Sequence, residues 1–85
     1  MIILNEYEGS KIDLDFHEGN LYEVLLRISD IARKDGVIVL VDQRIKGRIT
    51  LKLHEPWNHI LIEILAGLNF LAVIERNTIM ISLPQ

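Results

Sequence analysis

The chain contains no cysteine, which excludes disulfide bonds, thiolate metal sites and thiol catalysis together. It also lacks an excess of basic residues: nine lysines and arginines stand against twelve aspartates and glutamates, and the net charge is −3. Because contacts to phosphate supply most of the affinity for nucleic acid, this charge balance disfavours a nucleic acid partner. The absence of cysteine says little about compartment, since a periplasmic domain can fold without disulfides.

No apolar run approaches the roughly 20 residues that a membrane-spanning helix needs. The apolar start Met1–Leu4 is too short for the core of a signal peptide, and no run of basic residues precedes it. We expect the chain to be soluble as given. The missing signal does not fix the location, because a piece cut from a longer protein would lack it as well.

Apolar residues make up 49% of the 85-residue chain. A chain of this length is expected to form a single domain, here residues 1–85. Such a domain buries only roughly 60–65% of the surface that its unfolded form exposes, so its core leaves a thin margin of stability.

The first half of the sequence predicts a strand followed by a helix. Residues Lys11–Phe16 alternate between polar and apolar side chains, which is typical of a half-buried strand that ends before Glu18. Asn20 is suited to cap a helix, with Glu23 as its capping-box partner, and Gly36 is suited to end it. The apolar stripe of this helix consists of Leu21, Val24, Leu25, Ile28, Ile31 and Ala32.

The second half predicts two strands, a helix and a hairpin. Val37–Val41 is a run of five aliphatic residues, which favours a strand covered on both faces or placed at a sheet centre. Arg48–His54 alternates again, Pro56 suits the first turn of a helix, and Asn69 suits its left-handed end. The remaining features are the helical stripe Trp57, Ile60, Leu61, Ile64, Leu65 and Leu68, and two strands, residues 70–74 and 78–83, around a turn at 75–77.

Several short motifs occur in a specific order. They are Tyr7-x-Gly9-x-Lys11-Ile12-x-Leu14-x-Phe16, Val24-Leu25, the Val37–Val41 run, Ile45-Lys46-Gly47-Arg48-Ile49-Thr50-Leu51 and Pro56-Trp57-Asn58. In this order and spacing they resemble the short N-terminal domain shared by secretins and TonB-dependent receptors. The last two motifs are most similar to those of type IV pilus (PilQ-like) secretins. The resemblance covers about residues 7–83 and leaves residues 1–6 as a lead-in.

The resemblance implies an α+β fold of order β-α-β-β-α-β-β, with two helices packed between a two-stranded and a three-stranded sheet. It also implies a non-enzymatic interaction module without cofactors, in the periplasmic part of an outer-membrane secretin. The implied partners are neighbouring secretin subunits in a ring and an inner-membrane complex protein or pilus lipoprotein. The alternative is the signalling domain of a TonB-dependent receptor, which binds an anti-sigma regulator.

Two groups of side chains are candidates for contacts with partners. Tyr22 and Leu26 share one side of the first helix outside its stripe, with Arg33 below them. They form an exposed patch, or a second sheet buries them; the sequence leaves both open. The second group is the basic loop of Arg44, Lys46 and Arg48, which lacks the glycine-rich cradle of a phosphate site. We hypothesise that it pairs with charges across a ring.

Other polar and aromatic residues receive plainer interpretations. Trp57 is interpreted as a core residue rather than a binding anchor. The histidines, His17, His54 and His59, are interpreted as surface residues rather than zinc ligands. The carboxylate pairs Asp13/Asp15 and Glu6/Glu8 are interpreted as solvated faces rather than acid–base groups. The charged end of the first helix, Asp30, Arg33, Lys34 and Asp35, is either solvated or paired with a neighbouring subunit. Partner binding by strand addition to a sheet edge also stays open.

Overall fold

The computed structural model describes residues 8–84. The predicted lead-in of residues 1–6, which includes Glu6, and Tyr7 of the first motif lie outside these residues. The element order is β1 (Lys11–Asn20), α1 (Leu21–Lys34), β2 (Ile38–Val41), β3 (Arg48–Pro56), α2 (Trp57–Gly67), β4 (Leu71–Glu75) and β5 (Thr78–Ser82). This order confirms the predicted α+β succession.

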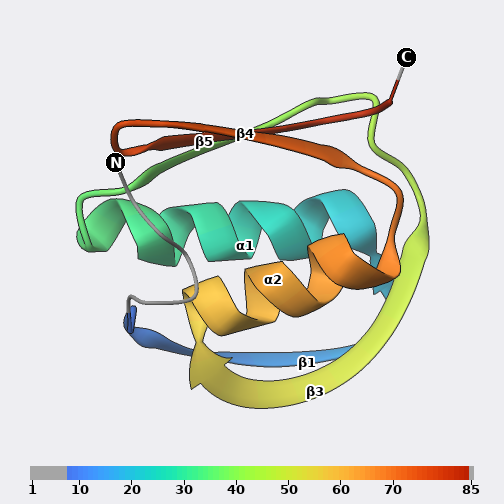
Figure 1. Ribbon diagram of the computed structural model, residues 1–85. Coiled ribbons are helices and arrows are strands. Elements are labelled where there is room, and N and C mark those ends of the chain that lie inside the picture. Colours follow the sequence, from blue (N-terminus) through green and yellow to red (C-terminus); the bar gives the residue numbers. More distant parts are fainter. Residues whose placement is uncertain (1–7, 85) are drawn as a thin grey trace.

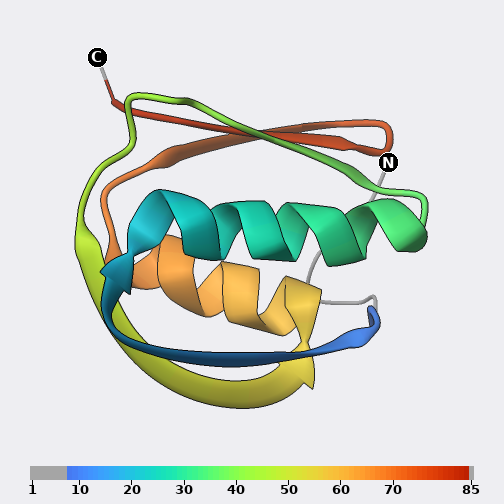
Figure 2. The ribbon, with the colours of Figure 1, turned by 180° about the vertical axis from the view of Figure 1, so that it is seen from behind.

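Two sheets enclose the two helices, as Figures 1 and 2 show from opposite sides. β1 and β3 pair antiparallel in one sheet. In the other, β5 is the central strand, parallel to β2 and antiparallel to β4. The prediction of two helices between a two-stranded and a three-stranded sheet is therefore confirmed.

Local signals fix both ends of α1. The side-chain oxygen of Asn20 accepts hydrogen bonds from the backbone N–H groups of Tyr22, at 2.9 Å, and Glu23, at 3.3 Å, and so satisfies two donors of the first turn. Gly36 follows the helix with a φ of 82°, a conformation that glycine adopts without strain. For α2, the predicted left-handed Asn69 is wrong: the helix ends in an extended Leu68.

The core lies where the helices meet the sheets. The two helical stripes supply most of its fully buried side chains, and Trp57 is 0% exposed, which confirms its interpretation as a core residue. The buried hydroxyl of Ser29 on α1 donates to the carbonyl of Val39 on β2 at 2.9 Å. This bond fixes the edge strand of the three-stranded sheet to the first helix.

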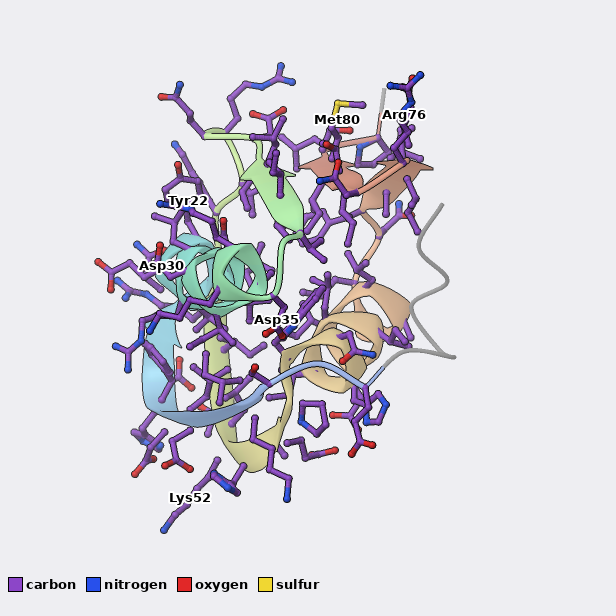
Figure 3. The ribbon with its side chains drawn as sticks, turned by 90° about the vertical axis from the view of Figure 1, so that its left-hand side faces the viewer. Tyr22, Asp30, Asp35, Lys52, Arg76 and Met80 are labelled. Atoms are coloured by element: carbon purple, nitrogen blue, oxygen red, sulfur yellow. The ribbon has the colours of Figure 1, made fainter. Side chains whose placement is uncertain are left out.

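One residue at the charged end of the first helix, Asp35, is not solvated as the first of the two predictions had it. Its side chain is half-buried and accepts hydrogen bonds from the backbone N–H and the hydroxyl of Ser10, both at 2.7 Å. The indole N–H of Trp57 donates to the same carboxylate. Figure 3 shows Asp35 turned toward the second helix, whereas Asp30 points outward.

Val37–Val41 forms the predicted strand, but its predicted cover on both faces or place at a sheet centre is wrong. β2 is an edge strand that pairs with β5 alone, and only one of its faces is covered by the described residues. Val37 and Val39 point into the core, whereas Ile38 and Leu40 are 46% and 51% exposed. A run of aliphatic residues therefore does not show by itself that both faces of a strand are covered.

The predicted end of the first strand is also wrong. β1 continues to Asn20 through an irregularity between Phe16 and Gly19, where the pairing with β3 shifts register. Glu18 has a φ of 53° at this point, and its N–H donates to the hydroxyl of Thr50 at 3.0 Å. The bulge extends the strand to the first residue before the helix.

Candidate functional site

The outer face of the two-stranded sheet is charged. Asp13 lies opposite His54 and contacts its imidazole Nδ1, and Asp15 lies opposite Lys52. Cross-strand pairs of opposite charge stabilise such a face modestly. These positions confirm the interpretation of Asp13, Asp15 and His54 as solvated surface residues.

The outer face of the three-stranded sheet is apolar, and sequence reasoning missed it. The strand register sets Leu40, Met80 and Val73 side by side in one row across the sheet, and each is at least 38% exposed. Figure 3 shows Met80 and Lys52 pointing away from the helices on opposite sides of the molecule. The outer face of one sheet is thus charged, and the outer face of the other is apolar.

Two of the predicted contact groups meet in one shallow hollow. Tyr22 from α1, Lys46 from the loop before β3 and Arg48, the first residue of β3, line a depression of about 470 Å³. The helix and the loop are joined there because the N–H of Leu21 donates to the carbonyl of Gly47 at 3.0 Å. The sequence offered no signal for this contact, since it depends on pairing between distant segments.

The backbone at Gly47 allows the loop to approach the helix. Its φ is 145°, a conformation that residues with a side chain rarely adopt. Arg48 follows directly, and its guanidinium reaches the carbonyl of Glu18 at 3.4 Å. Lys46 and Arg48 are exposed and Tyr22 is half-buried, so the hollow presents two cations beside a phenol ring.

Arg44 does not join this hollow. Its guanidinium bonds the carboxylate of Asp42 at 2.7 Å, and its backbone N–H donates to the same carboxylate at 2.9 Å. These hydrogen bonds from Arg44 lower the pKa of Asp42 to about 2. Arg44 is therefore engaged by its own loop, and its charge is offset locally.

Leu26 and Arg33 lie farther along the same helix. Leu26 is 40% exposed and lines a separate hollow of about 250 Å³ beside Phe16. Arg33 pairs with Asp30 at 3.4 Å, with both side chains largely exposed. An exposed pair of this kind contributes little stability. Figure 3 shows that Tyr22 and Asp30 share the side of α1 away from α2.

The sequence left open whether Tyr22 and Leu26 form an exposed patch or are buried by a second sheet. Leu26 is exposed, so for this residue the first alternative holds. Tyr22 is intermediate, because the loop before β3 flanks it. Within residues 8–84, no three side chains of His, Asp or Glu are grouped closely enough to hold a metal ion. Neither described helix has the length and apolar character that crossing a bilayer demands.

Comparison with known proteins found likeness in structure. No protein-family model and no curated protein sequence matches the chain. The structure of XcpQN012 superposes with a TM-score of 0.64 at 17% identity, over 92% of this chain and 38% of that one. The N0 domain of the type II secretin from enterotoxigenic Escherichia coli gives a TM-score of 0.64 at 9% identity, over 88% of this chain and 96% of that domain.

The first of these matches is a longer molecule, of which this chain spans well under half. The second is matched over almost its whole length. At these identities the likeness concerns the backbone and not the side chains at any site. The chain therefore has the fold of a secretin N0 domain.

Proposed function

We propose that this chain is a periplasmic protein–protein interaction module of an outer-membrane secretin, from a type IV pilus or a type II secretion system. It contributes to ring assembly and docks to an inner-membrane complex protein or a pilus lipoprotein. The observation that carries the proposal is the shared fold with the N0 domain of a type II secretin, matched over 96% of that domain. The sequence motifs favour the type IV pilus branch.

The composition of the hollow beside Tyr22 favours binding over catalysis. It presents two cations, and no serine, cysteine, histidine or carboxylate lines it. An enzyme site needs convergent acid, base or nucleophilic groups around a bound substrate. A protein partner needs only a complementary surface, and an aromatic ring beside arginine is a composition enriched at interfaces.

The hollow formed by Tyr22, Lys46 and Arg48 is the proposed docking surface. Two exposed cations there favour a partner segment rich in aspartate or glutamate, which would be steered by charge and held by contact with the tyrosine ring. Leu26 and Arg33 extend the same side of α1 and supply the outer part of the contact. Arg44 stays in its ion pair with Asp42, so it takes part in the contact as a residue of the same loop as Lys46 and not as a free charge.

Binding to purified periplasmic segments of inner-membrane complex proteins tests this function. The double change Lys46→Glu with Arg48→Glu is expected to weaken binding by about tenfold or more, because it replaces attraction by repulsion. The matched control is Lys11→Glu with Lys52→Glu, which makes the same change in net charge on the two-stranded sheet at positions that do not line the hollow. It is expected to retain binding within about twofold.

Two results would contradict the proposal. One is the absence of binding by the wild-type chain to every segment from both kinds of secretion system. The other is equal weakening by both double changes, which would show a general response to charge and no specific surface.

A further inference from the structure

Five apolar side chains form an exposed cluster on the outer side of the three-stranded sheet, and we call it the outer apolar face. Each member is between 38% and 51% exposed. The register places three of them in one row, one from each strand, and the other two beside it. The members are Ile38, Leu40, Leu71, Val73 and Met80.

The pattern of these strands is that of a sheet covered on both sides. β2 is aliphatic at every position, and β4 is apolar from Leu71 to Ile74. A sheet with one face in water normally alternates apolar and polar residues, and β1 with β3 follows that rule in this same molecule. Within residues 8–84, however, nothing covers the outer apolar face.

The charges around the cluster are balanced at each end. Glu75, the last residue of β4, lies on the same side of that strand as Val73 and is followed by Arg76 of the turn to β5. Asp42 and Arg44 form their ion pair just after β2, near the end of β5. Each end of the face thus carries one acid and one base, so the net charge of these four side chains does not oppose a contact between two copies.

We propose that the outer apolar face is covered by a second copy of this chain, packed sheet against sheet. The five side chains expose on the order of 400–500 Å² of apolar surface, about half of the roughly 800 Å² that one partner contributes to a standard interface. With its polar rim the contact falls at the small end of specific interfaces. The area therefore fits a weak, reversible dimer with interdigitated side chains.

This contact uses a different surface from the docking surface proposed above, because it involves neither Tyr22, Lys46 nor Arg48, and it can fail while docking at that surface holds. Sedimentation equilibrium of the full 85-residue chain tests it between about 10 µM and about 1 mM, the range in which a weak dimer forms. The average mass is expected to rise with concentration from the monomer mass of 9.8 kDa toward twice that value.

Matched substitutions locate the contact. Leu40→Lys places a charge in the middle of the outer apolar face and is expected to raise the dissociation constant by about tenfold or more. Leu68→Lys is the control, because Leu68 is also an exposed leucine, at 38%, but lies at the end of α2. This control is expected to associate as the wild type does. If the circular dichroism spectrum shows that Leu40→Lys does not fold, Met80→Lys is tested in its place.

A measurement on the wild-type chain also tests whether the outer apolar face is the contact. In methyl-labelled wild-type chain, the methyl resonances of Leu40, Val73 and Met80 are expected to shift with concentration, while that of Leu14 stays constant. Three results would overturn self-association: a monomer at every concentration, equal loss of association in both leucine variants, or concentration-dependent shifts on the other sheet. A monomer whose outer-face methyl groups shift only when a different periplasmic protein is added would assign the face to that protein.

Discussion

The indole nitrogen of Trp57 donates a hydrogen bond of 2.9 Å to the carboxylate of Asp35. This bond joins the start of the second helix to the end of the first. The same carboxylate accepts two bonds from Ser10, and the N–H of Trp57 donates to the carbonyl of Ser10 at 3.0 Å. One aspartate thus holds together three segments that are distant in the sequence.

This relationship explains two of the sequence motifs in physical terms. Gly9 lies close against the indole nitrogen of Trp57, and its N–H donates to the side-chain oxygen of Asn58 at 2.8 Å. The pair Trp57-Asn58 therefore serves the segment before β1 rather than a partner. Such buried polar contacts specify where the chain enters the fold.

Gly9→Ala is expected to destabilise the domain by about 1–3 kcal/mol, because overpacking forces neighbouring atoms to shift. A Cβ at this position would lie 2.2 Å from the indole nitrogen of Trp57 and 2.9 Å from the side-chain oxygen of Asn58. Urea unfolding followed by circular dichroism measures the change. The matched control is Gly67→Ala, at the last residue of α2, where no atom lies within 4 Å of the added group.

The control is expected to change stability in the opposite direction. Alanine favours a helix by up to about 1 kcal/mol over glycine, so Gly67→Ala should leave the domain as stable as the wild type or slightly more stable. If Gly9→Ala proved as stable as the wild type, the close approach of the chain to Trp57 would be incorrect.

A double-mutant cycle between Trp57 and Asp35 is expected to give a coupling free energy of about 1–2 kcal/mol. Trp57→Phe removes the donor, and Asp35→Ala removes the acceptor. Because each single change leaves the other group without this partner, the double variant should be more stable than the sum of the single effects allows. Additivity within about 0.3 kcal/mol would show that the two groups do not interact in solution.

The ion pair in the loop after β2 predicts a titration at low pH. Arg44 lowers the pKa of Asp42 from its ordinary value of 3.8 to about 2. A carboxyl group whose pKa is lower in the folded than in the unfolded state stabilises the folded state at any pH above its unfolded pKa. The contribution of Asp42 is therefore present above about pH 4 and is lost as the pH falls through about 2. Carbon-detected NMR of the aspartate carboxyl groups measures the midpoint.

Arg44→Ala should move the midpoint of Asp42 back toward 3.8. Arg33→Ala is the control, because Arg33 is an exposed arginine that pairs with Asp30. A midpoint for Asp42 near its ordinary value in the wild-type chain would show that Arg44 is free, and Arg44 would then be available to a partner.

The elements of the fold could largely be predicted from the sequence, because their signals are local. The stripes of α1 and α2, the cap at Asn20 and the glycine at position 36 all act within a few residues. The ends of strands were harder, since the bulge at Glu18 depends on Thr50 across the sheet. Periodicity inside one strand carries no information about its neighbour.

The surfaces could be predicted only in part. The exposed Leu26 and the basic loop were identified from position and charge, but the contact that brings Tyr22 beside Lys46 and Arg48 depends on the bond between Leu21 and Gly47. The outer apolar face was missed because an aliphatic run such as β2 predicts burial on both sides, whereas within the described residues only one side is covered.

Chemical-shift mapping tests the proposed docking surface most directly. ¹⁵N-labelled chain is titrated with the periplasmic segments of inner-membrane complex proteins, and the backbone resonances that change are assigned to residues. We expect the changes to cluster at Tyr22, Lys46, Gly47 and Arg48, with smaller changes near Leu26. Changes confined to the charged face around Asp13 and Lys52, or no change with any segment, would contradict the docking surface.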